Sequence, residues 1–167
     1  MEENVTTIEL PKKRPTFLTV ICILSFIGSG FLLGSNIYQY FMFESTYAKQ
    51  MEMFETQQEA LSDAGIESGF SYNSIQNAIV TLEKTSQNLG LISGANILFA
   101  ILSLLGVFLM FKMSKNGFYL YTFANLFWLL VPLALIDFEA TMMNTAVLGF
   151  FTIIFVIMYA VNLKHMK

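Results

Sequence analysis

This 167-residue chain contains few residues that could perform acid–base chemistry or bind a metal. It contains one cysteine, Cys22, and one histidine, His165, which are too few for a zinc, haem or iron–sulfur site. Asp137 and Glu139 stand two residues apart, so their carboxylates would point apart on a helix. We interpret them as boundary charges of an apolar segment, with a metal or catalytic pair as the alternative. Phosphate-binding glycine motifs, HExxH and GxSxG are absent, and we expect no enzyme, cofactor or metal.

Two asparagines inside apolar segments need hydrogen-bond partners, because an unpaired amide is costly in lipid. They occur in similar contexts, Gly34-Ser35-Asn36 and Gly94-Ala95-Asn96. Each lies about 10 Å below the same end of its segment at 1.5 Å rise per residue. Antiparallel neighbours would therefore bring the two amides to one depth. We predict a hydrogen-bonded clasp between Asn36 and Asn96, with a polar ligand pocket as the alternative.

Small residues favour close approach of helices in lipid. The first apolar segment carries Gly30 and Gly34 in a GxxxG motif, and the second carries Gly90 and Gly94 in another. We predict that these glycines pack the first two membrane helices against each other. An interface between chains is the alternative.

Four apolar blocks must position these residues. Hydrophobic residues make up 55% of the chain and charged residues 13%, about half the charge of a typical soluble domain. Each block is long enough for the ~20 residues that a membrane helix needs. None has an Asp, Glu, Lys, Arg or His in its interior, which disfavours a monomeric ion-coupled transporter but leaves open a pore lined by Ser, Thr and Asn. The predicted spans are residues 16–43, 89–111, 118–136 and 143–163.

The segment 44–88 between the first two spans is polar, yet it keeps helical periodicity. One stripe runs from Tyr47 to Leu61 with Gln58 interrupting it, and a second runs from Tyr72 to Leu82. A breaker cluster, 65–69, separates them. The predicted fold is therefore all-α: a polytopic membrane four-helix bundle whose first two helices extend into an extracytoplasmic helical hairpin. Its acidic side chains are a possible partner surface or ordinary solubilising charge: Glu52, Glu55, Glu59, Asp63 and Glu67.

Lysine and arginine counts set the orientation. Seven lie in the arm at residues 1–15, the loop between the second and third spans, and the tail, whereas the hairpin has only Lys49 and Lys84. The rule places the arm and both termini in the cytoplasm, followed by one membrane domain at 16–167. The net charge of −3 and the pI near 5.1 argue against a nucleic-acid partner.

The run from Lys13 to Gly30, KRPTFLTVICILSFIGSG, resembles the first helix of small four-helix membrane proteins of the Bacteroidota, especially flavobacteria. The resemblance covers about 18 residues and the four-span layout. It implies a bacterial inner membrane and implies no activity. Cys22 lies within this run, and we expect it to be a core residue.

Three functions remain. The first is a non-enzymatic accessory or scaffolding subunit of an inner-membrane complex, which contacts another membrane protein or further copies of itself through helix faces and the acidic hairpin. The second is a small oligomeric transporter or channel lined by Asn, Ser and Thr. A lipid-modifying enzyme ranks last because no nucleophile or acid–base set is present.

Overall fold

The computed structural model describes residues 14–167, so the predicted arm lies outside the described part except for Arg14 and Pro15. Its helices are α1 (Thr16–Asp63), α2 (Phe70–Gln87), α3 (Leu89–Phe111), α4 (Lys115–Leu135), α5 (Phe138–Asn162) and the 3-10 helix η1 (Leu163–His165). No strand occurs among the described residues. Four helices, α1, α3, α4 and α5 with η1, are long and apolar enough to cross a membrane. The all-α prediction with four spans is confirmed, and the chain has the helices of a multi-pass membrane protein.

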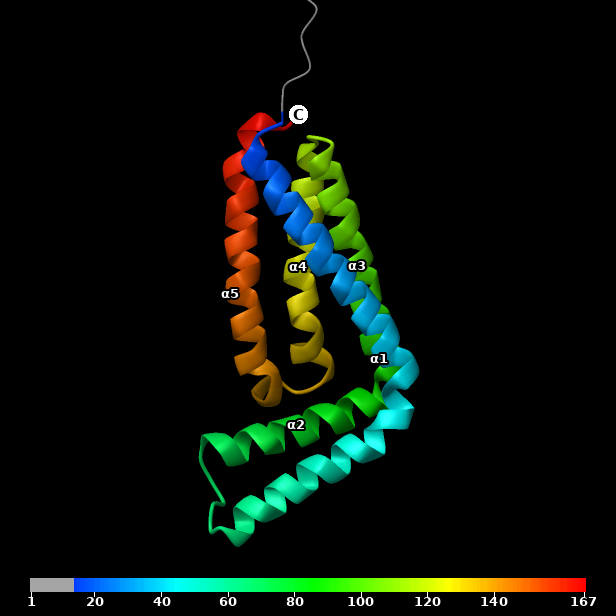
Figure 1. Cartoon of the computed structure of the whole chain (residues 1–167), viewed down its shortest axis with the longest axis vertical. Coiled ribbons are helices and arrows are strands. Elements are labelled where there is room, and N and C mark those ends of the chain that lie inside the picture. The colour runs from blue at the N-terminus through cyan, green and yellow to red at the C-terminus, as the bar shows by residue number, and fades with distance from the viewer. Residues whose placement is uncertain (1–13) are drawn as a thin grey trace, which may run out of the picture.

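The four apolar helices form one bundle with two different ends. α4 lies between α3 and α5, and α1 crosses them obliquely, from α5 at one end to α3 at the other (Figure 1). We call the end with the α3–α4 loop and the C-terminus the basic end, because it holds Lys112, Lys115, Lys164 and Lys167. There the amide of Lys167 donates to the carbonyl of Met113 at 2.7 Å, and the amide of Lys115 donates to the carbonyl of Lys167 at 2.8 Å. We call the opposite end the hairpin end.

The predicted helical hairpin is present, formed by the second half of α1 and by α2. Its turn contains Gly65 and Gly69, whose φ angles of 75° and 101° are readily adopted only by glycine. Between the two helices, Gln58 Nε2 donates to the hydroxyl of Tyr72 at 3.0 Å. The residue expected to interrupt the apolar stripe therefore joins the two helices.

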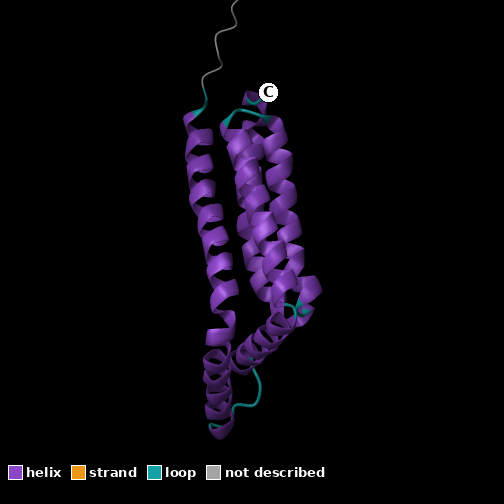
Figure 2. Ribbon diagram, turned by 90° about the vertical axis from the view of Figure 1, so that its right-hand side faces the viewer, coloured by secondary structure: helices purple, strands orange, loops and turns teal. Residues whose placement is uncertain are grey.

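The hairpin does not project straight out of the bundle. α1 changes direction in the stretch coloured cyan, and α2 then passes across the hairpin end, where it contacts α5 (Figure 1, Figure 2). The hydroxyls of Ser45 and Thr46 both donate to the carbonyl of Met42, at 2.8 and 2.9 Å. Bonds of this kind bend helices without proline or glycine, and α1 has neither between Gly34 and its end. The bend lets the hairpin cover the end of the bundle.

The apolar core lies at the basic end, where α1, α3, α4 and α5 converge. Tyr159 is its largest fully buried side chain; its hydroxyl donates to the carbonyl of Ile21 at 3.1 Å. The Tyr159 ring meets that of Tyr121 edge-on, with centroids 5.0 Å apart. Cys22 is fully buried in this core, as expected from the sequence.

The four motif glycines do not pack α1 against α3, so this prediction is wrong. Gly30, Gly34, Gly90 and Gly94 are exposed, and a Cβ added to any of them meets no atom within 4 Å. α1 instead presents a stripe that includes Ser25 and Ser29 to the bundle. A GxxxG motif permits close approach of a backbone but does not decide which face of the helix turns inward.

The close glycine contact in this chain joins α3 to α4. A Cβ on Gly106 would lie 2.7 Å from the amide nitrogen of Tyr121. A Cβ on Gly117 would lie 2.5 Å from both the carbonyl oxygen of Gly106 and the amide nitrogen of Met110. Gly106 thus faces the backbone of Tyr121, and Gly117 faces the backbone of Gly106 and Met110. Neither glycine belongs to a motif that marked this contact in the sequence.

Three of the apolar helices begin and end near the predicted spans, whereas α1 continues past the predicted span 16–43 into the hairpin. α3 matches the predicted 89–111, whereas α4 begins at Lys115 and α5 begins at Phe138. Asp137 caps α5: its Oδ1 accepts a hydrogen bond from the amide of Ala140 at 2.9 Å. The boundary charge therefore starts the fourth span rather than merely ending the third.

Candidate binding site at the hairpin end

Polar side chains connect the helices in the middle of the bundle. The hydroxyls of Ser29 in α1 and Ser103 in α3 lie 3.0 Å apart. Asn125 of α4 donates to Ser103 at 3.0 Å and to the carbonyl of Tyr121 at 2.8 Å. These bonds satisfy polar groups that lipid could not, and they link three of the four spans at one level.

The predicted Asn36–Asn96 clasp is not formed. Asn96 Oδ1 accepts a hydrogen bond from Trp128 Nε1 at 3.1 Å. Asn36 Nδ2 donates to the carbonyl of Leu32 in its own helix at 2.7 Å. The indole N–H of Trp128 can only donate, and Asn96 supplies its acceptor. The two asparagines nevertheless lie close together, since both line one small cavity of about 20 Å³.

We predict that Asn96 is energetically coupled to Trp128 and not to Asn36. A double-mutant cycle of Asn96→Leu with Trp128→Phe should give a coupling of about 0.6 kcal/mol, a typical value for hydrogen bonds between membrane helices. The same cycle with Asn36→Leu should be additive within about 0.3 kcal/mol. Reversible unfolding in mixed micelles measures both. Strong coupling between Asn36 and Asn96 would contradict this prediction and would support the hydrogen-bonded clasp.

A large cavity lies between the hairpin and the end of the bundle. Its volume is about 1080 Å³, and α1, α2, α3 and α5 all contribute to its wall. Binding pockets for small molecules commonly measure about 300–1,000 Å³, so this space can hold a ligand of substantial size. The bend of α1 creates it, because the hairpin is carried across the bundle end.

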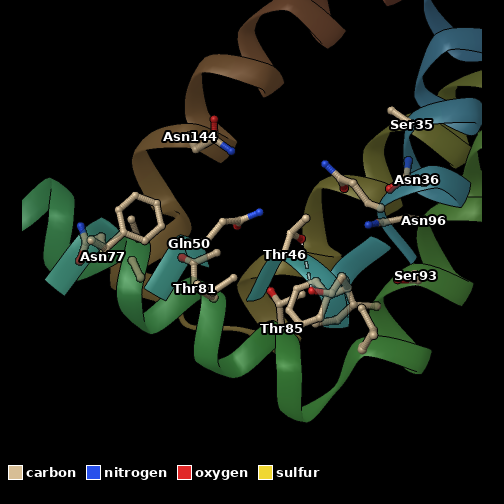
Figure 3. A pocket seen from close by; sticks show the side chains of 18 of the residues that line it. Ser35, Asn36, Thr46, Gln50, Asn77, Thr81, Thr85, Ser93, Asn96 and Asn144 are labelled. Carbon is tan, nitrogen blue, oxygen red and sulfur yellow. Dashed lines mark hydrogen bonds between the residues drawn. The ribbon is translucent and has the colours of Figure 1, made fainter. Parts of the chain in front are cut away.

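About half of the residues that line the cavity carry a carboxamide or a hydroxyl, although most of the wall surface is apolar, and none of the lining residues is charged. Figure 3 shows Gln50, Asn96 and Asn144 turned toward the same space from three helices. The carboxamides are those of Asn36, Gln39, Gln50, Asn73, Asn77, Asn96 and Asn144. The hydroxyls are those of Ser35, Tyr38, Thr46, Ser74, Thr81, Thr85 and Ser93.

Several of these polar groups have no partner among the described residues. Ser93 is only 8% exposed, lines the cavity, and makes no side-chain hydrogen bond there. Gln50, Asn77 and Asn144 also line the cavity without such a bond; Gln50 and Asn144 are exposed and Asn77 is half-buried. The wall therefore offers donors and acceptors to whatever occupies the space.

Only two residues of this wall, Asn36 and Asn96, were identified from the sequence, because an unpaired amide inside an apolar segment is energetically costly. The contribution of the hairpin, including Gln50, Asn77 and Thr81, was missed. These residues sit in a polar segment where amides and hydroxyls are ordinary. Only the bend of α1, which brings the hairpin over the bundle, makes them converge.

The other predicted site residues lie elsewhere. The carboxylates of Glu52, Glu55, Glu59, Asp63 and Glu67 are exposed on the hairpin, and none lines the cavity. Asp137 and Glu139 stand at the start of α5. Within residues 14–167, no group of three or more His, Cys, Asp or Glu side chains could hold a metal ion.

In comparisons with known proteins, no family model, no curated protein and no solved structure matches the chain.

Proposed function

We propose that this chain is a non-enzymatic accessory subunit that holds another protein in the membrane. The observation that supports this best is the exposure of both GxxxG motifs. Gly30 and Gly34 in α1, and Gly90 and Gly94 in α3, have open space where a side chain would be. Glycine is about 1 kcal/mol less favourable than alanine inside a helix, and no contact with residues 14–167 offsets that cost here.

We call the exposed surface of α1 at Gly30 and Gly34 the glycine face, and its proposed partner is a transmembrane helix of another protein. Lipid tails accept any apolar surface, whereas a helix backbone gains most from small residues that let it come close. Outside the membrane, Glu52, Glu55, Glu59 and Asp63 recur at intervals of three and four residues and form an exposed acidic ridge on α1. A basic surface on the same partner would complement this ridge.

We further propose that the chain lies in a bacterial inner membrane with its basic end in the cytoplasm. The support is the excess of lysine and arginine at that end and the resemblance of the first helix. The hairpin and its acidic ridge are then extracytoplasmic.

Leucine at both Gly30 and Gly34 should abolish partner association and leave the chain folded. The new side chains would fill the approach surface without meeting any atom of the chain itself. Association is measured by quantitative mass spectrometry of proteins that co-purify with the tagged chain from its native membrane in mild detergent. Unfolding temperature in the same detergent should stay within a few degrees.

Gly28→Leu is the matched control, because Gly28 is equally open but lies on the other side of the buried Ser25–Ser29 stripe. It should retain the partner. A lone monomer from the unaltered chain would refute the proposal, and a homo-oligomer would assign the glycine face to a second copy.

A small oligomeric transporter or channel is the second candidate, favoured by the polar cavity at the hairpin end. Within one chain the cavity has no continuation through the core at the basic end, where Leu18, Met110 and Tyr159 are fully buried. This function therefore requires a path between subunits. Solute flux into liposomes separates it from the first proposal.

A further inference from the structure

We propose that the cavity at the hairpin end binds a lipid with an uncharged, hydroxyl-rich headgroup. The headgroup occupies the space between the hairpin and the bundle, and the acyl chains lie along α5. Four features carry this assignment: the neutrality of the wall, its hydrogen-bonding groups, its aromatic rings and the apolar edge of its mouth.

The neutral wall selects a neutral ligand. None of the residues that line the cavity is acidic or basic. A charged headgroup that left water for this space would lose its hydration without meeting a counter-charge, which is strongly unfavourable. An uncharged headgroup therefore fits this wall better than a phosphate headgroup that would need a counter-charge.

The polar groups of the wall select a ligand that both donates and accepts hydrogen bonds. A carboxamide does both, as does a hydroxyl. Ser93 lines the cavity from α3 and is 8% exposed, and Gln50 and Asn77 approach from the hairpin. Phe43 and Phe54 add aromatic surface. Clustered hydroxyls on a ring with apolar C–H faces, as in a sugar, match this combination.

The mouth of the cavity opens onto an apolar surface that could carry the apolar part of a lipid. Met143 and Val147 of α5 line the cavity and are 66% and 51% exposed. Phe150, Phe151 and Ile154 continue this exposed apolar surface along α5 at helical spacing, into the membrane span. The acyl chains of a lipid whose headgroup occupies the cavity can therefore lie on this surface.

The chain contains its own reporter of occupancy. Trp128 is its only tryptophan, and its indole N–H is bonded to Asn96, whose amide lines the cavity. A ligand that bonds to Asn96 changes the electrostatic surroundings of the indole. Its fluorescence should therefore shift as the cavity fills.

The test uses the full chain in phosphatidylglycerol nanodiscs, titrated with diglucosyl-diacylglycerol. We expect a saturable shift of Trp128 emission that additional phosphatidylglycerol does not produce. Asn77→Leu should raise the half-saturating mole fraction about tenfold, the factor that corresponds to ~1.4 kcal/mol for a lost hydrogen bond. Gln50→Leu is a second variant, in case the first does not fold.

Gln76→Leu is the control: Gln76 neighbours Asn77 on α2 but is exposed and does not line the cavity. It should bind like the unaltered chain. Equal weakening by Gln76→Leu, or an equal response to phosphatidylglycerol, would overturn the proposal. An equal response to free maltotriose in buffer would assign the cavity to a soluble saccharide and overturn the lipid assignment.

Discussion

Alanine at Gly117 is expected to cost about 3 kcal/mol of unfolding free energy, the upper range for forcing extra volume into a packed interior. The added methyl group would lie 2.5 Å from the carbonyl oxygen of Gly106 and from the amide nitrogen of Met110. Both atoms belong to a helix backbone, which cannot rotate away as a side chain can. α3 and α4 must therefore separate, and that separation also disturbs the core that they share with Tyr121. Reversible unfolding in mixed micelles measures the loss.

Gly30→Ala is the matched control and should have the opposite sign. Gly30 has no neighbour within 4 Å of an added Cβ, so the better helix propensity of alanine should stabilise the chain by up to about 1 kcal/mol. Gly106→Ala should resemble Gly117→Ala, because its added methyl group would lie 2.7 Å from the amide nitrogen of Tyr121. If Gly117→Ala and Gly30→Ala had equal effects, the assignment of the α3–α4 contact would be wrong.

Alanine at Tyr159 should cost about 3 kcal/mol, within the range for removing large side chains from packed cores. Tyr159 is fully buried, packs edge-on against Tyr121, and bonds to the carbonyl of Ile21. It is therefore the main side-chain connection of α5 to both α1 and α4. Its removal should leave α5 as the first helix to detach, and cysteine accessibility at Cys22 should rise, because that thiol is buried in the same cluster.

Two variants separate the packing of Tyr159 from its hydrogen bond. Tyr159→Phe keeps the ring and should lose only about 0.6 kcal/mol, the average for hydrogen bonds between membrane helices. Tyr119→Ala removes a side chain that is 63% exposed and should be nearly neutral. A loss in Tyr159→Phe as large as that in Tyr159→Ala would show that the hydrogen bond, rather than the ring, holds α5.

The sequence could predict the four spans and the hairpin because both follow from the local order of residues. The uncharged run 89–111 coincides with α3, because the preference of a segment for lipid is the sum of the preferences of its own side chains. The stripes ending at Leu61 and Leu82 likewise predicted two helices joined at 65–69. Hydropathy and periodicity are sufficient for such features.

Contacts between helices could not be predicted in the same way, because they depend on how each helix is rotated about its axis. Gly34 and Gly90 belong to clear motifs and yet face outward, while Gly106 and Gly117 lie in no motif and touch. Asn96 is hydrogen-bonded to Trp128 rather than to Asn36, because α4 also packs against α3 at that level. The cavity depends on the bend in α1, which arises from hydroxyl groups bonded to the carbonyl of Met42.

The placement of the core at one end has a mechanical consequence. α5 is held by Tyr159 near the basic end, whereas Asn144 in the cavity wall lies 15 residues away, about 22 Å at the rise of an α-helix. α5 is also held at that far end, because it contacts α2 and because Thr141 and Thr145 are buried there. It therefore connects the hairpin that covers the cavity to the core at the basic end through one continuous helix.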